Sequence, residues 1–431
     1  MQALKITGGK PLHGEVTISG AKNAATKMMI AALLTDEPVV LYNIPKISEI
    51  DITTDIIKAT GASVEREDHT IRIHAESLTG AGVKQLSRKN RISILALSPL
   101  LHRLGEAEVP VVDGDHIGPR PVNFHIQALE QMGAQISADA TGYHARASRL
   151  QGTTIRLPYP SVGATENILL AAVLAEGRTS IYNAATEPEI LDLIKLLQQM
   201  GAIIEFRANR VIIIDGVERL HGASYRVMPD RLEAASYAAA AIATNGKITV
   251  KGAYQGDLST FLNTIRRIGG DYQVNDSDIT FKRGPEGLRG AELETDTWPG
   301  FSTDWQQPLI VVLTQADGLS VVHETVYEDR FGYTEVLNQM GANIAVFTKC
   351  LGELECRFKG ESHKHSAIIQ GPSRLRGAKI EIPDIRAGMA HVIAALVADG
   401  TSTLTGVEHL LRGYDQFLDK LESIGAKFKT N

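Results

Sequence analysis

The chain repeats one local pattern six times, and this repetition limits the folds that it can adopt. In each copy a helical segment ends in a Gly-Ala-type turn and a short apolar strand follows; the glycines are Gly61, Gly133, Gly201, Gly269, Gly341 and Gly425. Successive copies lie about 70 residues apart, with a longer interval before the last. Solenoid repeats run to roughly 20–50 residues. The longer period therefore indicates a compact subdomain that is used six times.

The order of elements within one copy follows from hydrophobic periodicity. Residues 161–177 are predicted as a helix that ends at Gly177, and 179–184 as a short strand. An amphipathic helix is predicted over 187–202, and the β-branched segment 203–215 is typical of a hairpin. Each copy is therefore predicted to be a βαβαββ unit that buries its sheet against its helices.

Six such units divide naturally into two groups of three. A chain of 431 residues is long for a single hydrophobic core. It starts with a predicted strand and ends with a helix and a strand, so the last group is expected to include the N-terminal strand. We predict an α/β (α+β) fold with one domain at 22–229 and the other at 1–21 together with 230–431. The chain would cross between them at a hinge near Gly20 and Pro229.

Composition and charge exclude several classes of protein. The net charge of −6 gives no basic surface for a nucleic acid, and no apolar run reaches the ~18–20 residues of a membrane span. The chain is therefore expected to be cytoplasmic, to bind no nucleic acid and to enter no membrane. Cys350 and Cys356 are its two cysteines, which excludes a disulfide framework.

The two cysteines are interpreted as ordinary thiols, because neither has a histidine partner at a zinc-ligand spacing. The polar stretch 345–378 around them is interpreted as a surface insertion in the sixth unit that carries no chemistry. A metal-binding tract at His363 and His365 is the alternative. The expectation is that the protein uses no metal and no cofactor.

Two turns before helices in the first half of the chain carry polar residues that folding does not require. Lys22 follows Ser19 and Gly20 at a helix start, where backbone N–H groups and the lysine charge would attract an anion. The loop 111–125 is rich in Gly and Pro and carries Asp115, His116 and Arg120 into the next helix. We interpret this loop as a lid that holds an acid and an anion clamp.

The second half carries an acid and three arginines at comparable turns. Asp304 is predicted at a helix start, either as its cap or as the acceptor of a proton from a substrate hydroxyl. Arg330, Arg386 and Arg412 are each predicted at an equivalent position of three successive units, and Arg91 adds a fourth from the other domain. Arginine binds phosphate or carboxylate through two parallel hydrogen bonds. No phosphate-binding GxxxxGK[ST] or GxGxxG motif supports nucleotide hydrolysis or nicotinamide chemistry.

Together these motifs resemble the enolpyruvyl transferases over nearly the whole chain, and within them the members that act on UDP-N-acetylglucosamine. The resemblance rests on SGAKNAA (19–25), RISILALSPLL (91–101), GDHIGPRPVNFHIQALEQMGA (114–134), SVGATEN (161–167), MPDRLEA (228–234), PGFSTDWQ (299–306), EDRF (328–331), DIRAG (384–388) and RGYDQFLDKLESIGA (412–426). It implies two inside-out α/β barrel domains with a cleft between them. It also implies transfer of the enolpyruvyl group of phosphoenolpyruvate to the 3′-hydroxyl of UDP-N-acetylglucosamine, the first committed step of peptidoglycan synthesis.

The resemblance also implies roles for single residues. Asp115, Lys22, Asp304 and Arg412 would be catalytic, with Asp115 as general acid. The substrate-binding residues would be Asn23, Arg91, Arg120, Pro121, Val122, Asn123, His125, Ser161, Val162, Gly163, Arg330 and Arg386. Most relatives have cysteine where this chain has Asp115. Because fosfomycin alkylates that thiol, the chain is expected to be insensitive to it.

Two other functions are compatible with these residues. The chain could be an enolpyruvyl transferase that acts on another nucleotide or nucleotide sugar in secondary metabolism. It could also be a non-catalytic paralogue that binds UDP-sugars. A protein that only binds UDP-sugars would not need the complete set of an acid, a base and an anion clamp.

Overall fold

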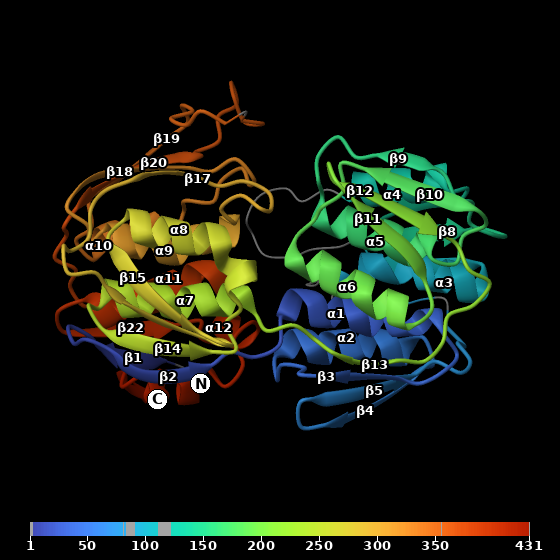
Figure 1. Cartoon of the computed structure of the whole chain (residues 1–431), viewed down its shortest axis with the longest axis horizontal. Helices are drawn as coiled ribbons and strands as arrows, with labels where there is room; N and C mark the ends of the chain where they lie inside the picture. Colours follow the sequence, from blue (N-terminus) through green and yellow to red (C-terminus); the bar gives the residue numbers. More distant parts are fainter. Residues whose placement is uncertain (1–2, 81, 83–90, 111–121, 355, 431) are drawn as a thin grey trace. The chain divides into compact units, whose positions relative to one another are not determined.

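The computed structural model describes residues 3–80, 82, 91–110, 122–354 and 356–430, which form two compact units (Figure 1). We call residues 3–19 with 229–430 the terminal unit, and the described residues between 20 and 228 the central unit. Across the described residues, no helix combines the length and the apolar character that a membrane span requires.

The central unit contains three small sheets. Their strands are, in spatial order, β13 (Ser224–Arg226), β3 (Val39–Tyr42), β5 (Thr70–His74) and β4 (Ser63–Glu67); β6 (Glu106–Pro110), β8 (Gly142–Arg146) and β7 (Gln135–Asp139); and β11 (Ile203–Arg207), β12 (Val211–Asp215), β10 (Arg178–Tyr182) and β9 (Thr154–Arg156). The helices are α1 (Lys22–Ala31), η1 (Ala32–Leu34), α2 (Ser48–Ala59), η2 (Ile92–Ala96), α3 (Leu97–Leu104), α4 (Asn123–Gln131), α5 (Val162–Ala172) and α6 (Pro188–Gln199).

The terminal unit has the same construction. Its strands are, in spatial order, β15 (Gly270–Asn275), β16 (Asp278–Arg283), β14 (Lys247–Lys251) and β2 (His13–Thr17); β17 (Glu292–Glu294), β18 (Gly318–His323), β20 (Ser366–Gly371) and β19 (Ile344–Phe347); and β21 (Lys379–Glu381), β22 (Thr401–Thr405), β1 (Leu4–Thr7) and β23 (Lys427–Thr430). The helices are α7 (Arg231–Ala243), η3 (Gln255–Leu258), α8 (Ser259–Arg267), α9 (Thr303–Leu313), α10 (Thr334–Gln339), α11 (Ile385–Val397), α12 (Glu408–Leu411) and α13 (Phe417–Ser423).

Every four-stranded sheet has the same pairing, which confirms the predicted βαβαββ unit. In the third sheet β9 runs parallel to β10, β10 pairs antiparallel with β12, and β12 pairs antiparallel with β11. The two ends of the chain complete the pattern in the last sheet, where β1 lies between β22 and β23. The described strands form six separate sheets and do not join into a closed barrel.

The core of each unit is made of helices, with the sheets outside them. In the terminal unit every residue of α7 is buried, and α7, α9 and α11 pack against one another between the sheets (Figure 1). Alanines at 234, 235 and 238–241 give α7 a thin profile, so its neighbours can approach closely. This arrangement confirms the mixed α/β class and the inside-out order of layers.

The six Gly-Ala turns share one backbone conformation. Their glycines have φ between +79° and +109°, which is the left-handed region that favours glycine after a helix. Gly177 also has a positive φ, of +87°, but α5 ends earlier, at Ala172, so the predicted helix 161–177 is too long at its C-terminal end. The longer connection that was assigned to the sixth unit belongs to the fifth, because it joins β19 to β20.

The surroundings of two of these glycines predict that a Gly→Ala substitution will destabilise the protein to different degrees. Gly269 and Gly425 both lie in the terminal unit, with φ of +89° and +79°. A Cβ at Gly425 would make ordinary contact with the carbonyl oxygen of His13 at 3.5 Å, whereas a Cβ at Gly269 would collide with that of Gly287. We expect Gly425→Ala to lower the free energy of unfolding by about 1–2 kcal/mol through backbone strain, and Gly269→Ala to lower it clearly more. Urea unfolding followed by circular dichroism checks this, and equal losses would refute the steric argument.

Candidate functional site

Three helix starts meet inside the terminal unit. The first helix of each of its repeats begins after a residue whose side chain accepts hydrogen bonds from N–H groups of the first turn; these caps are Asp230, Ser302 and Asp384. The starts of α7, α9 and α11 are close enough for the charges of Arg231 and Arg386 to act on Asp304. A buried cluster of helix starts with charged side chains is a suitable environment for an anion.

Asp304, in the first turn of α9, lies between two guanidinium groups. Nη2 of Arg330 donates to its Oδ1, and Nε of Arg386 lies 3.4 Å from its Oδ2. Burial would raise the pKa of Asp304, but the charges of Arg330 and Arg386 outweigh that effect and hold the pKa well below its usual range. In this arrangement the carboxylate is ionised and is a weak proton acceptor. The structure thus brings together three of the predicted site residues.

Glu324 holds this arrangement in place and was missed from the sequence. Its buried carboxylate accepts hydrogen bonds from Thr303 Oγ1 at 2.9 Å and from Gln306 Nε2 at 3.1 Å. Arg330 Nη1 in turn donates to Thr303 Oγ1 at 2.9 Å. The signal was an acidic residue directly after the apolar strand that ends at His323.

The three arginines do not occupy equivalent positions, so that prediction is wrong. Arg330 lies between the second strand and the second helix of the fifth repeat, and Arg412 lies in the corresponding connection of the sixth, after α12. Arg386 lies in the first turn of α11, also in the sixth repeat. In the fourth repeat the first turn of α7 carries Arg231, one position nearer its cap than Arg386 is, and it packs over Trp305 at 5.2 Å from the guanidinium carbon to the ring centre.

In the central unit, α1 begins with two of the predicted residues. Lys22 Nζ lies 3.7 Å from Oε1 of Glu49, and the carbonyl oxygen of Asn23 accepts a hydrogen bond from Lys27 Nζ at 2.8 Å. Ala21, which precedes the helix, has no side-chain acceptor for the N–H groups of the first turn. The start of α1 is therefore less well capped by its own chain than the starts of α7 and α11.

The Ser161-Val162-Gly163 turn lies next to His125. Ser161 caps α5, and a Cβ at Gly163 would lie 3.1 Å from Cε1 and Nε2 of His125, so a larger residue here would need the imidazole to shift by a few tenths of an ångström. Burial and the charge of Arg91 lower the pKa of His125 to about 3, which keeps the imidazole neutral. The structure thus brings His125, Arg91 and the predicted turn together on one side of the central unit.

Glu166, inside α5, is a second residue that the sequence analysis missed. Its carboxylate is buried and lies 3.7 Å from Lys27 Nζ, so it links α5 to α1. Burial raises the pKa of Glu166 to about 7, against the opposing charge of Lys27. It stands in the quoted motif SVGATEN, and the signal that was available is that it is the one ionisable residue of α5.

Several predicted residues of the loop 111–125 lie outside the described residues: Asp115, Arg120 and Pro121. Their roles therefore stay predictions. Of the residues that follow, Val122 is buried before α4, and Asn123 is exposed in its first turn.

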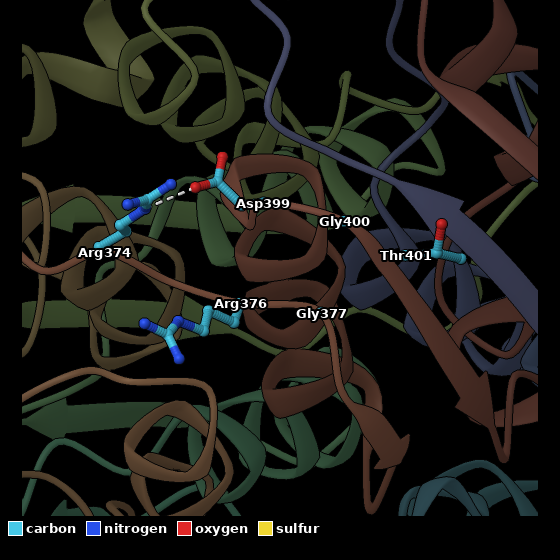
Figure 2. A pocket seen from close by; sticks show the side chains of 6 residues that line it. All are labelled: Arg374, Arg376, Gly377, Asp399, Gly400 and Thr401. Carbon is cyan, nitrogen blue, oxygen red and sulfur yellow. Dashed lines mark hydrogen bonds and ion pairs between the residues drawn. The ribbon is translucent and has the colours of Figure 1, made fainter.

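One hollow on the terminal unit contains none of the predicted site residues. It has a volume of about 360 Å³ and is lined by Arg374, Arg376, Gly377, Asp399, Gly400 and Thr401 (Figure 2). Figure 2 shows Arg374 directed toward Asp399, with Nε 2.7 Å from Oδ2. Because both side chains of this ion pair are more than half exposed, at 81% and 54%, the hollow is an open surface feature.

The structure overturns the interpretation of the cysteines as thiols without a histidine partner. Cys350 Sγ lies 3.3 Å from Nε2 of His365, and His323 of β18 lies beside both cysteines. The sequence spacing hid this, because His323 reaches the cluster through strand pairing: it lies opposite Ser366 in the β18–β20 ladder. Burial and the neighbouring Cys350 raise the pKa of the Cys356 thiol to about 11.

Comparison with known proteins bears on the whole chain. The family model for EPSP synthase (3-phosphoshikimate 1-carboxyvinyltransferase) matches residues 6–421. The UDP-N-acetylglucosamine 1-carboxyvinyltransferase of Protochlamydia amoebophila is 48% identical, over 99% of this chain and 94% of that protein. The protein of the same name from Chlamydia abortus is 46% identical, over 99% and 98% of the two chains. UDP-N-acetylglucosamine 1-carboxyvinyltransferase 2 of Bacillus subtilis is 38% identical, over 99% and 96%.

Solved structures show the same fold at lower identity. The enolpyruvyl transferase NikO from Streptomyces tendae matches with a TM-score of 0.86 at 24% identity, over 99% of this chain and 98% of that one. The EPSP synthase from Acinetobacter baumannii matches with a TM-score of 0.73 at 19% identity, over all of both chains. These two matches concern the fold alone.

The raised pKa of Glu166 predicts a pH dependence of stability. The folded value of about 7 lies above the ordinary 4.5, so the protonated form stabilises the fold fully below pH 4.5, and this contribution is lost as the pH rises through 7. We expect wild type to lose on the order of 3 kcal/mol from this group between pH 4.5 and 8, and Glu166→Gln to lose that much less. Urea unfolding at a series of pH values measures the difference. The exposed Glu176→Gln is the matched control, and parallel curves for all three proteins would contradict the assignment.

Proposed function

The chain belongs to the enolpyruvyl transferase family, and on this premise we propose that it transfers the enolpyruvyl group of phosphoenolpyruvate to the 3′-hydroxyl of UDP-N-acetylglucosamine and releases phosphate. The relatives named for this reaction match over 99% of the chain. The reaction belongs to peptidoglycan synthesis, and through the cell wall it would serve cell shape and cell division. We place it in the cytoplasm.

The observation that carries the proposal within the structure is the pair of buried guanidinium groups on Asp304. Arg330 and Arg386 are fixed by Thr303 and by Tyr414, whose hydroxyl accepts from Arg386 Nη1 at 3.4 Å. Guanidinium groups held in this way are ready to bind a phosphate or a carboxylate, because their hydrogen-bond geometry is set in advance. Both substrates of the proposed reaction are anions of this kind.

The same pair suggests how Asp304 would become a base. While Arg330 and Arg386 are paired with the Asp304 carboxylate, the pKa of this group is low and it is a poor acceptor of protons. A bound anion that shares these guanidinium groups would offset their charge, so the pKa of Asp304 would rise toward its usual value. Asp304 would then orient the sugar 3′-hydroxyl and accept its proton when the substrates are in place.

The chemistry then needs one acid and a clamp for the leaving phosphate. Asp115 would donate a proton to the methylene carbon of phosphoenolpyruvate while the sugar oxygen bonds to the adjacent carbon, which gives a tetrahedral ketal phosphate. The Asp115 carboxylate would then take a proton back from the new methyl group while phosphate departs with the electrons of its C–O bond, which restores the double bond. Lys22, Arg120 and Arg412 would hold the phosphate and carboxylate, with Arg91 nearby.

The nucleotide sugar would be bound mainly by uncharged groups of the central unit. Asn23 and the Ser161-Val162-Gly163 turn would contact the sugar and diphosphate, because the starts of α1 and α5 present backbone N–H groups. Pro121, Val122, Asn123 and His125 would line the uridine side. The neutral imidazole of His125 suits a hydrogen bond to an uncharged base better than an ion pair.

Phosphate release tests the reaction and the acid together. We expect the protein to release phosphate from phosphoenolpyruvate only when UDP-N-acetylglucosamine is present. Asp115→Asn removes the proton donor and should lower kcat by roughly 10²–10⁴-fold, and Asp304→Asn should do the same by removing the base. A coupled phosphate assay under saturating substrates measures both.

Asp55→Asn is the control for these two variants, because this aspartate is exposed on α2 and is none of the candidate residues. Full activity of Asp115→Asn would refute the acid role alone. A folded wild-type protein that releases no phosphate with this acceptor would refute the proposed substrate, and would favour another nucleotide acceptor or a non-catalytic binder.

Fosfomycin provides a separate test of position 115. A carboxylate at this position lacks the thiolate that opens the epoxide, so wild-type activity should be unchanged after preincubation with fosfomycin. Asp115→Cys should be inactivated with time, with the mass of one fosfomycin added to the protein. Alkylation of wild type with loss of its activity would contradict this expectation.

A further inference from the structure

Four side chains that the proposed reaction does not use gather at one end of the fifth sheet. His323 ends β18, His365 directly precedes β20, and Cys350 and Cys356 lie in the connection from β19 to β20. Both histidines are fully buried, and both cysteines are partly buried. One ligand atom from each residue lies within 4.8 Å of the other three.

These distances match a tetrahedral metal site. Zinc binds sulfur at about 2.3 Å and nitrogen at about 2.0–2.1 Å, so the ligand atoms of a tetrahedron lie roughly 3.3–3.8 Å apart. Cys350 Sγ and His365 Nε2 are already 3.3 Å apart, and the rest of the cluster lies within reach of a common centre.

The histidines are oriented for metal binding through Nε2. His365 Nδ1 lies 2.7 Å from the carbonyl oxygen of His363, which can only accept, so Nδ1 carries the proton and Nε2 presents its lone pair. His323 Nδ1 lies 2.8 Å from Ser366 Oγ, while its buried Nε2 has no hydrogen-bond partner among the residues that the structure describes. Metal-binding histidines commonly have their second nitrogen fixed in this way.

The segment that carries the cysteines is built against His323. A Cβ at Gly352 would collide with Glu294 Oε2 and would come 2.6 Å from His323 Cδ2, so the backbone passes close to both of these side chains. Glu294 of β17 accepts hydrogen bonds from the backbone N–H groups of Glu353 at 2.8 Å and Leu354 at 2.9 Å. These contacts hold the turn between the two cysteines over the end of the sheet.

We propose that His323, Cys350, Cys356 and His365 bind one Zn²⁺ ion in a closed structural site. Two thiolates and two imidazoles in a tetrahedron are the donor set of structural zinc. A Rieske-type [2Fe–2S] centre also uses two cysteines and two histidines, but it holds the cysteines on one iron and the histidines on the other. The 3.3 Å between Cys350 Sγ and His365 Nε2 fits ligands of one shared ion instead. An ion such as Mg²⁺ would need oxygen ligands. A disulfide between the cysteines would not explain why two buried histidines lie beside them.

The ion would stabilise the segments that hold Arg330 of the candidate site in place. His323 is followed by Glu324, which fixes Thr303 and through it Arg330. From the connection itself, His363 Nδ1 lies 2.9 Å from Asp329 Oδ2, and Arg357 donates to the carbonyl oxygen of Val326. Zinc would thus fasten the β19–β20 connection onto the turn that carries Arg330.

Metal content of the full-length, untagged protein tests the proposal. After purification under reducing conditions and exhaustive buffer exchange, we expect inductively coupled plasma mass spectrometry to find one zinc per chain. A mercurial that blocks thiols should release this zinc to a colorimetric chelator. Protein reconstituted with Co²⁺ should show the absorption of tetrahedral cobalt bound by thiolates. These readouts use wild type, so they do not depend on a variant that folds.

A pair of variants then assigns the ligands. Cys350→Ser combined with Cys356→Ser should lose the zinc, whereas His363→Asn in the same connection should keep it, because His363 is paired with Asp329 outside the cluster. Wild type with almost no zinc after incubation with the ion, a persistent Cys350–Cys356 disulfide under reducing conditions, or equal zinc in the double variant would each overturn the proposal.

Discussion

Burial of the first helix of each repeat is the constraint on which the other features depend. A helix such as α7, buried along its whole length, cannot leave the N–H groups of its first turn to water. Side chains must satisfy them, and Asp230 and Asp384 do so for α7 and α11. The polar chemistry of the terminal unit is therefore concentrated where its buried helices begin, and the remainder of the core can be apolar.

The same constraint sets the electrostatics of Asp304. Its carboxylate is buried, yet it stays ionised because Arg330 and Arg386 compensate its charge. Anions that enter such a place compete with Asp304 for the same guanidinium groups. In the proposed reaction, substrate binding and proton transfer would then be coupled through these shared guanidinium groups, so the two arginines would both position a substrate and set the pKa of the base.

The elements with a local cause were predictable from the sequence. A turn glycine such as Gly133 is needed for its own positive φ. The order of strands and helices in a βαβαββ unit follows from the hydrophobic pattern of six consecutive segments. The pairing of Asp304 with two arginines was not predicted. The family resemblance assigned the three residues to one site, but Arg386 comes from another repeat and its contact depends on how α9 and α11 pack. Glu324 was missed because its partners Thr303 and Gln306 lie on α9. His323 was missed because its neighbours are set by the register of β18 against β20. Asp115 and Arg120 lie outside the described residues, so the roles predicted for them are not compared with the structure.

The position of β1 has a consequence for the order in which the chain is made. All strands of the central unit, including β13, precede residue 229, so this unit can fold while the remainder is still being synthesised. The terminal unit cannot complete its last sheet at that stage, because β1 pairs with β22 and β23, which follow the whole central unit in the sequence. Until then β1 lacks both of its partners, whereas β2 can pair as soon as β14 has been made. Unpaired strand edges attract other chains. A nascent chain therefore exposes the unpaired edges of β1 throughout the synthesis of the central unit and of the segment that leads to β22.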